Sequence, residues 1–234
     1  MKQRYALEVS DLNFSWHKNS PAILDIKSLS ISLGQSLFIQ GSSGSGKSTL
    51  LNLLSGVLKS EKGSISLLGQ PFSSLSNAKR DQFRANHIGY IFQQFNLLPY
   101  LSVIDNVLLP VKLSVTRRKG ERHNASTLID EAKHWLNQLR VPENLFYEKV
   151  SRLSIGQQQR VAAARAMIGS PEIIIADEPT SALDHDNVHN FMDVLVNQCQ
   201  EIKSSLVFVS HDTQLGDYFD QTYSLNHSTS RGYL

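Results

Sequence analysis

The N-terminal part of the chain alternates hydrophobic and polar residues, as expected of β-strands that bury one face. This alternation covers residues 29–33, where Leu29, Ile31 and Leu33 are separated by serines, and is weaker at residues 7–9. Residues 63–69 continue the pattern. We therefore expect a small N-terminal antiparallel sheet.

Four further segments are almost entirely apolar, which is the pattern of buried strands. They are residues 36–40, 87–92, 172–176 and 205–210. A leucine-rich helix is expected after the first of them, beginning near Lys47 and continuing through residues 50–58. Strands that alternate with helices predict an α/β fold with a parallel sheet.

Between roughly residues 94 and 160 the pattern becomes helical, which predicts a helical subdomain inserted in the α/β core. Ser102 and Asp105 resemble a capping box at a helix start. From Ala125, apolar residues recur at 128, 129, 132, 135, 136 and 139, typical of an amphipathic helix. The charged residues 117–122 before it are expected to form a solvated loop.

Composition narrows the function classes. A length of 234 residues suits one domain with a subdomain, and we take residues 1–234 as a single domain. The net charge of +2 gives no electrostatic reason to expect nucleic acid as a partner. Cys199 fits a small core residue. With no apolar leader and no apolar run of 18 residues, we expect a cytoplasmic chain that does not cross a membrane.

Residues 41–49 match the pattern G-x-x-x-x-G-K-[ST] between a predicted strand and a predicted helix. Glycines let successive amides converge on one anion, and the helix N-terminus adds positive potential. Lys47 is expected to reach the β and γ phosphates and Ser48 to ligate Mg²⁺. The expected phosphate contacts are Gly41, Ser42, Gly44, Ser45, Gly46, Lys47, Ser48 and Thr49.

Two adjacent carboxylates follow the apolar strand at 172–176, at the sheet edge where open α/β folds bind ligands. Asp177 can hold Mg²⁺ through water. Glu178 is then placed to polarise an attacking water, an effect worth roughly 10²- to 10⁴-fold in rate.

Polar residues also follow the other predicted strands. Gln93 is placed to contact Mg²⁺ or the attacking water, although Gln94 is chemically an equally good candidate. His211 could donate a hydrogen bond to a γ-phosphate. At residues 153–157, Ser154 can cap a helix whose first amides, with Gly156 allowing close approach, form a second anion site.

Five motifs follow one another along the chain: the phosphate loop, Gln93, Leu-Ser-x-Gly-Gln at 153–157, Ala176–Asp184 and Ser210–Asp212. Both the motifs and their order resemble those of the ATP-binding cassette (ABC) ATPases, and the match covers nearly the whole chain. The resemblance implies a P-loop NTPase core that binds and hydrolyses ATP with Mg²⁺.

The same resemblance implies that two chains meet head to tail with ATP between them. Ser154, Gly156 and Gln157 would then face the nucleotide of the opposite chain, while Asp184 couples the two sites. It also implies that Glu178 is the catalytic base, Gln93 and His211 assist catalysis, and Trp16 stacks on adenine. Trp16 could instead belong to the core. Ile155 departs from the small residue usual in the family.

Residues 88–110 resemble the lipoprotein-release and macrolide-efflux group and the related cell-division ATPases. Asp105 stands where that group usually has Glu, and residues 181–184 also resemble importer ATPases. The group implies a separately encoded integral membrane permease as partner and a position on the inner face of the cytoplasmic membrane.

The partner is expected to dock on the apolar cluster of Phe95, Leu97, Leu98, Tyr100 and Leu101, about half of which we expect in the core. Alternatives are an importer-type ABC ATPase and a soluble ABC protein acting on ribosomes or DNA, although the chain has neither a second cassette nor a long coiled coil. A GTPase or kinase would leave residues 153–157 unexplained. A non-hydrolysing subunit would not require Lys47, Glu178 and His211.

Overall fold

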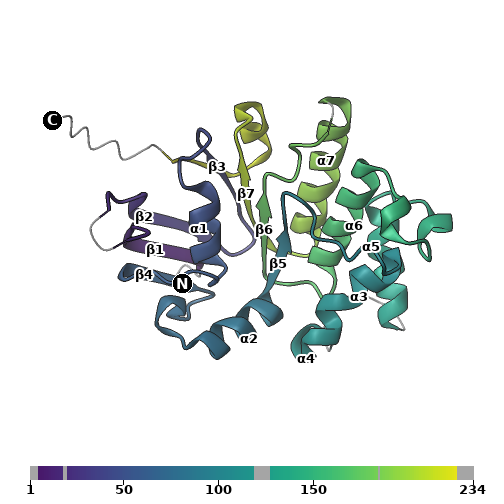
Figure 1. Ribbon diagram of the computed structural model, residues 1–234, viewed down its shortest axis with the longest axis horizontal. Helices are drawn as coiled ribbons and strands as arrows, with labels where there is room; N and C mark the ends of the chain where they lie inside the picture. The colour runs from purple at the N-terminus through teal and green to yellow at the C-terminus, as the bar shows by residue number, and fades with distance from the viewer. Residues whose placement is uncertain (1–4, 18–19, 119–126, 184, 226–234) are drawn as a thin grey trace.

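A five-stranded parallel sheet forms the centre of the protein (Figure 1). The computed structural model describes residues 5–17, 20–118, 127–183 and 185–225. The sheet order is β5-β6-β7-β3-β8, and every neighbouring pair is parallel. The strands are β3 (Ser36–Gln40), β5 (Ile88–Ile91), β6 (Ile173–Asp177), β7 (Ser205–Ser210) and β8 (Gln221–Ser224). Because they are parallel, the segments that follow β3, β5, β6 and β7 emerge at one edge.

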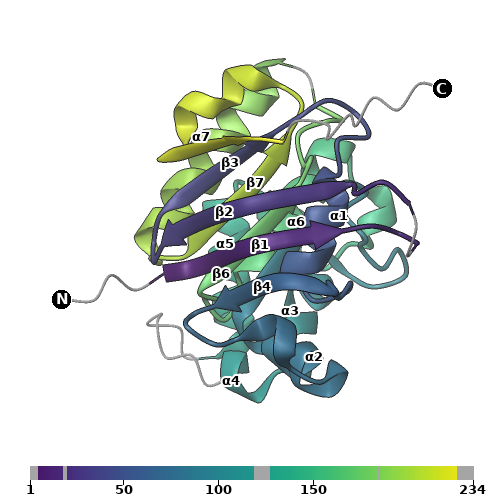
Figure 2. The same cartoon turned by 90° about the vertical axis from the view of Figure 1, so that its left-hand side faces the viewer.

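A second, antiparallel sheet lies beside the first, as Figure 2 shows. It has the order β2-β1-β4, with β1 (Tyr5–Phe14), β2 (Leu24–Ser32) and β4 (Lys62–Leu67). The predicted N-terminal sheet is confirmed. Leu33, however, lies beyond the end of β2 and is 45% exposed, so the alternating pattern overestimated the length of that strand.

The parallel sheet separates two hydrophobic cores because successive side chains of a strand point to opposite faces. Leu37 and Ile39 face the antiparallel sheet and α1, whereas Phe38 between them faces the helical side. In β6, Ile173 and Ile175 belong to the core beside the antiparallel sheet and α1, and Ile174 belongs to the core on the helical side. Cys199 is buried on the helical side, and burial raises the pKa of its thiol to about 12, which confirms the predicted core role.

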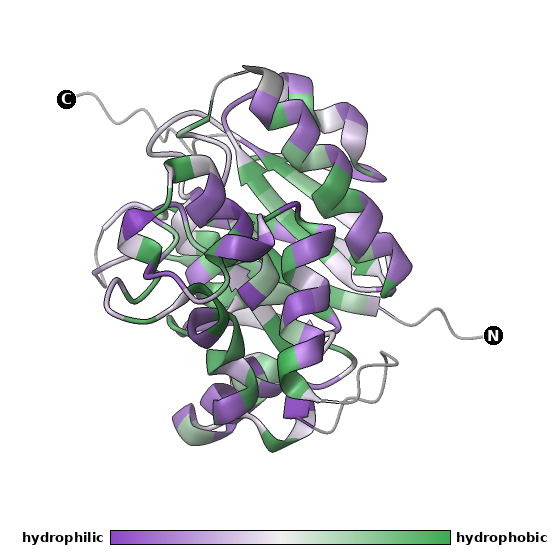
Figure 3. Cartoon of the chain, turned by 90° about the vertical axis from the view of Figure 1, so that its right-hand side faces the viewer, coloured by the Kyte–Doolittle hydropathy of each residue, from purple (hydrophilic) through white to green (hydrophobic). Residues whose placement is uncertain are grey.

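Helices cover the core on the helical side of the parallel sheet, and their hydrophilic faces point outward (Figure 3). The α-helices are α1 (Lys47–Leu54), α2 (Asn77–His87), α3 (Val103–Leu113), α4 (Val115–Arg118), α5 (Leu128–Gln138), α6 (Ile155–Met167) and α7 (His185–Glu201). Short 3-10 turns are η1 (Phe72–Ser74), η2 (Glu143–Leu145), η3 (Val150–Arg152) and η4 (Thr213–Tyr218). Within the described ranges, no helix combines the length and apolarity needed to span a membrane.

Helix boundaries agree with the capping chemistry more closely than with the apolar pattern. The Ser102 hydroxyl caps α3 by accepting from the Asp105 amide, as predicted. Helix α5 begins after Thr127, which caps it in the same way; the predicted start at Ala125 lies outside the described residues. Helix α1 ends at Leu54 rather than Leu58 because Gly56 has a φ of 74°.

The prediction of a solvated charged loop after residue 116 is wrong for Arg117. Its side chain is 4% exposed and donates to the carbonyl oxygens of Ala166 and Ile168 at the end of α6, at 2.6–3.0 Å. Arg117 therefore satisfies carbonyls that the helix end leaves without partners.

Candidate active site

The phosphate loop connects β3 to α1, as predicted. Gly44 and Gly46 have φ values of 78° and 95°, a region that side chains disfavour. A Cβ on Gly46 would also stand 2.8 Å from the Leu24 side chain, and one on Gly41 would stand 2.9 Å from the Leu225 carbonyl oxygen. The loop conformation therefore requires glycine at these three positions.

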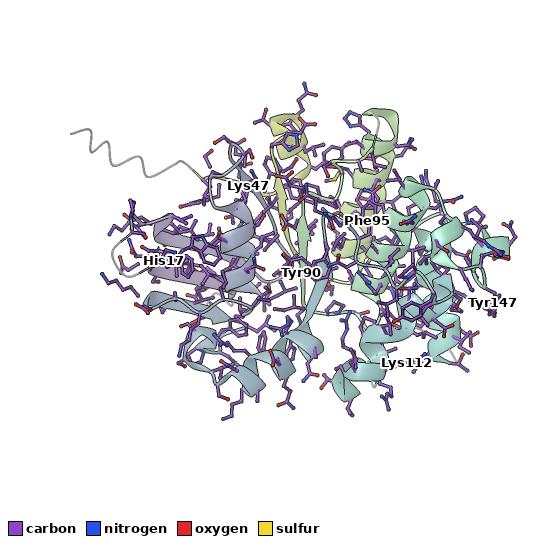
Figure 4. All side chains as sticks on the ribbon, in the orientation of Figure 1. His17, Lys47, Tyr90, Phe95, Lys112 and Tyr147 are labelled. Atoms are coloured by element: carbon purple, nitrogen blue, oxygen red, sulfur yellow. The ribbon has the colours of Figure 1, made fainter. Side chains whose placement is uncertain are left out.

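Lys47, the first residue of α1, folds back into the loop that it terminates (Figure 4). Its side chain is 6% exposed, and Nζ donates to the carbonyl oxygens of Gly41 and Ser42 at 2.8 and 3.0 Å. Nζ also lies 3.4 Å from Glu178 Oε1. A buried ammonium at the centre of this loop is a ready partner for a phosphate group.

Asp177 and Glu178 lie where β6 ends, beside the phosphate loop. Burial, the neighbouring Glu178 charge and a hydrogen bond from Ser48 act on Asp177, and the net effect raises its pKa. Glu178 has a φ of 42°, and its amide donates to the Val209 carbonyl oxygen at 3.0 Å. Positive φ on a non-glycine residue is a strained conformation of the kind found at functional sites. This backbone conformation places the Glu178 carboxylate between two groups, the Lys47 ammonium and the His211 ring.

The second of those groups is the His211 ring, which follows β7 and has Nδ1 3.3 Å from Glu178 Oε2. The structure thus brings Lys47, Glu178 and His211 together. Gln93 follows β5 at the same sheet edge and is exposed, as is Gln94, so the choice between these two glutamines stays a prediction.

Residues 154–157 begin α6 with the predicted cap. The Ser154 hydroxyl accepts from the Gln157 amide at 3.3 Å, and the Gln157 side chain accepts from the Ser154 amide at 2.9 Å, which completes a capping box. A Cβ on Gly156 would meet only the Leu183 side chain, at 3.7 Å. Within the described part of the chain, no hydrogen bond or ion pair joins these residues to the phosphate loop.

Trp16 is 53% exposed and packs edge-on against Phe14, with ring centroids 5.3 Å apart, so the alternative core role is wrong. Its ring lines a pocket of about 310 Å³ that Lys59 and Lys62 also border. A larger hollow of about 800 Å³, bordered by Leu33, lies elsewhere and contains none of the predicted site residues. Asp184 lies outside the described residues.

The oxygen donors near the phosphate loop suit a hard divalent cation. The Ser48 hydroxyl is near enough to the Asp177 carboxyl to act on its pKa, and hydroxyl and carboxylate oxygens are ligands that Mg²⁺ prefers. Among the described residues, no cluster of three His, Cys, Asp or Glu side chains is placed to hold a metal.

The contacts that Glu178 makes with Lys47 and His211 could not be predicted from the sequence. The Lys47–Glu178 ion pair and the positive φ of Glu178 have no local sequence signal, because Glu is not a residue type that favours this region. The motifs nevertheless indicated that Lys47, Glu178 and His211 lie close together, because each of these residues follows a strand of the predicted parallel sheet.

Comparisons with known proteins agree with this geometry. The ABC transporter family model matches residues 24–181. The lipoprotein-releasing system ATP-binding protein LolD of Hydrogenovibrio crunogenus is 37% identical over 221 residues, covering 94% of this chain and 93% of that protein. The bacitracin export ATP-binding protein BceA of Halalkalibacterium halodurans is 34% identical over 214 residues, covering 91% and 81%.

A solved structure, the dimeric post-hydrolysis state of the ATP-binding cassette MJ0796 bound to ADP and Pi, superposes with a TM-score of 0.81. It is 31% identical and covers 94% of both chains. The predicted fold and the predicted lipoprotein-release group are confirmed. The chain belongs to the ABC transporter family, in which it is an ATP-binding and ATP-hydrolysing subunit.

Proposed function

We propose that the chain works as a homodimer in which each phosphate loop faces residues 154–157 of the other chain, with ATP between them. The observation that carries this proposal is the open space beside Gly156, in the first turn of α6. A Cβ at this position would have only the Leu183 side chain near it, so the exposed start of the helix leaves room for a ligand. The dimer described for the MJ0796 cassette supports it.

Each end of the proposed ATP site has a distinct task. Lys47 compensates phosphate charge, and the hydroxyls and amides of residues 41–49 orient the phosphates. Ser154, Gly156 and Gln157 of the opposite chain approach the γ-phosphate. Trp16 stacks on the adenine base, for which the adjoining 310 Å³ pocket leaves room. Asp184 links the two sites.

Mg²⁺ would be held by Ser48, Asp177 and Gln93, and when bound it neutralises charge on the phosphate oxygens. Glu178 orients and deprotonates the attacking water once Lys47 has turned to the phosphate. His211, 3.3 Å from Glu178, holds that carboxylate and reaches toward the γ-phosphate. The strained backbone of Glu178 fixes the direction of its side chain.

The dimer would dock on a separately encoded integral membrane permease, from the cytoplasmic face, and drive it by ATP hydrolysis. The names of its relatives, a lipoprotein-releasing system and a bacitracin exporter, support a membrane partner. Of the apolar cluster predicted to dock, Phe95 is buried and Leu97 packs against the core, whereas Tyr100 is 68% exposed. Tyr100, with the half-buried Leu98 and Leu101, is the proposed contact.

The test is to purify the chain with its native membrane partner and insert both into lipid vesicles. We expect the chain to bind partner-containing vesicles and to hydrolyse ATP faster there than alone. The matched control is the Glu178→Gln chain, which should bind the same vesicles without hydrolysis. Equal binding to protein-free vesicles would contradict docking on a protein partner.

A further inference from the structure

We propose that Arg165 is a positioning residue that joins the segment after Gln93 to helix α6, so that movement at one ATP site is passed to the residues facing the other. The inference rests on the proposed roles of Gln93 and Ser154. It concerns a side chain that touches neither nucleotide, and it is carried by two hydrogen bonds of Arg165 and by the hydrogen bonds of Asn106 to the same segment.

Arg165 projects from α6 into the core and is 8% exposed. Its guanidinium donates to the carbonyl oxygen of Asn96 at 2.7 Å and to that of Phe95 at 2.5 Å. Phe95 and Asn96 have φ values of 59° and 48°. Two successive non-glycine residues in this region are strained, and a bulky one such as Phe95 is an outlier. The two hydrogen bonds therefore hold a conformation that the chain would otherwise leave.

Asn106 of α3 fixes the same segment from its other end. Its side chain is fully buried, accepts from the Leu98 amide at 2.8 Å and donates to the Leu98 carbonyl oxygen at 3.1 Å. It also donates to the Ser102 carbonyl oxygen at 3.0 Å. Residues 95–98 begin two positions after Gln93 and are thus attached by side chains to both α3 and α6. Figure 4 shows Phe95 between the central sheet and the helical layer.

The Arg165 contact is expensive for the fold, which argues for a positional role. Both of its hydrogen-bonded acceptors are neutral carbonyls, and burial lowers the pKa of its guanidinium to about 10. Burying a cation without an opposite charge costs more than packing an apolar side chain of similar length. A methionine would fill the same space but could not hold Phe95 and Asn96.

Helix α6 can carry the motion because it is a continuous rod. Arg165 is eleven positions after Ser154, which at a rise of 1.5 Å per residue is about 16 Å. A displacement of the Gln93 segment, when γ-phosphate binds or leaves, therefore moves the helix whose N-terminus faces the opposite nucleotide. Hydrogen bonds and rigid secondary-structure elements can carry such coupling between two sites, and Arg165 joins the Gln93 segment to α6 in this way.

The chain offers a matched control in Arg117. It too is a buried arginine that donates to backbone carbonyl oxygens of the α6 region, and burial lowers its pKa to about 10 as well. Its acceptors, the carbonyl oxygens of Ala166 and Ile168, lie at the same C-terminal end of α6 as Arg165, but its hydrogen bonds do not involve residues 95–98. Arg117 also has the charges of Glu131 and Glu172 nearby, whereas Arg165 has only the cost of burial, so substitution of Arg117 should cost at least as much stability. A larger loss of kcat on substitution of Arg165 would then reflect a positional role and not lost stability.

The experiment compares Arg165→Met, Arg165→Lys and Arg117→Met by thermal unfolding, ADP affinity and kcat for ATP. We expect Arg165→Met to keep ADP affinity within about twofold and to lose at least about tenfold in kcat. It should also lower ATP-driven dimerisation in the Glu178→Gln background. Arg165→Lys, which can still donate to one carbonyl, should recover part of the loss. Arg117→Met should keep kcat within about twofold even though its melting temperature should fall at least as far as that of Arg165→Met.

Equal kcat losses in the Met variants of Arg165 and Arg117 would overturn the inference, as would wild-type kcat in Arg165→Met. If Arg165→Met does not fold, Arg165→Lys decides: wild-type kcat and dimerisation in that variant count against the positional role. A wild-type chain that does not hydrolyse ATP or dimerise would instead refute the proposed function, so the two failures are distinguishable.

Discussion

The ion pair between Lys47 and Glu178 should compete with bound phosphate, which leads to a quantitative prediction. Nζ of Lys47 lies 3.4 Å from Glu178 Oε1 and donates to two loop carbonyl oxygens. A phosphate that recruits Lys47 must therefore separate it from Glu178. Replacing Glu178 by Gln removes this competitor, so we expect Glu178→Gln to bind ADP more tightly than the wild type.

The size of the effect follows from the separation and the burial of the pair. At 3.4 Å and an effective dielectric constant of about 20, two unit charges interact by about 5 kcal/mol. Desolvation offsets most of this for side chains that are 6% and 19% exposed. A net value of about 1 kcal/mol remains, the upper end for exposed pairs, and it corresponds to about fivefold in Kd.

The assay is titration of the isolated chain with fluorescent ADP, which has no γ-phosphate and is not hydrolysed. Removing the Glu178 charge also lowers its repulsion of the ADP phosphates, so the same substitution is made in a Lys47→Met chain. The gain that remains there measures repulsion, and the difference between the two gains measures the ion pair. His211→Ala, which leaves the pair intact, should change ADP affinity by less than about twofold. Equal gains in both backgrounds would refute the reasoning.

Three further predictions concern the dimer, the metal-binding carboxylate and the partner. With ATP, Glu178→Gln should form a stable dimer in light scattering, and adding Ser154→Arg should abolish it by placing bulk and charge in the interface. Asp177→Asn should raise the melting temperature at pH 7 while abolishing hydrolysis, because the raised pKa of Asp177 means that folding disfavours its charged form. The gain should shrink as the pH falls toward 3.8, the ordinary pKa, because the wild-type carboxyl is then increasingly neutral in the folded and the unfolded state alike. Tyr100→Asp should remove stimulation by the membrane partner but keep basal hydrolysis, measured in vesicles and in solution respectively; unchanged stimulation would exclude Tyr100 from the contact.

The sheet and the phosphate loop were predictable because their determinants are local. Apolar runs mark β3, β6 and β7, and polar residues directly after them must meet at one edge when the strands are parallel. Ser154 and Gln157 are a local signal too, since three residues separate a cap from its partner. For these elements a short stretch of sequence contains the information needed.

Long-range contacts were not predictable from the same patterns. Arg117 looked like part of a charged surface loop, and only the carbonyls of Ala166 and Ile168, some 50 residues later, explain its burial. Arg165 has no sequence signal beyond its type, because its acceptors precede it by about 70 positions. The exposure of Trp16 likewise depends on how β1 packs, which the alternation of the strand does not specify.

The open space at Gly156 has a genetic consequence. Because a side chain there would meet only Leu183, at 3.7 Å, a bulky substitution should leave the fold of its own chain intact and harm the partner's ATP site. In the proposed symmetric dimer, such a chain would be synthesised normally and would pair with wild-type chains. At equal expression, random pairing would leave only about one quarter of the dimers free of the variant. A Gly156 variant should therefore be dominant over the wild-type copy, whereas a chain that cannot fold would be recessive.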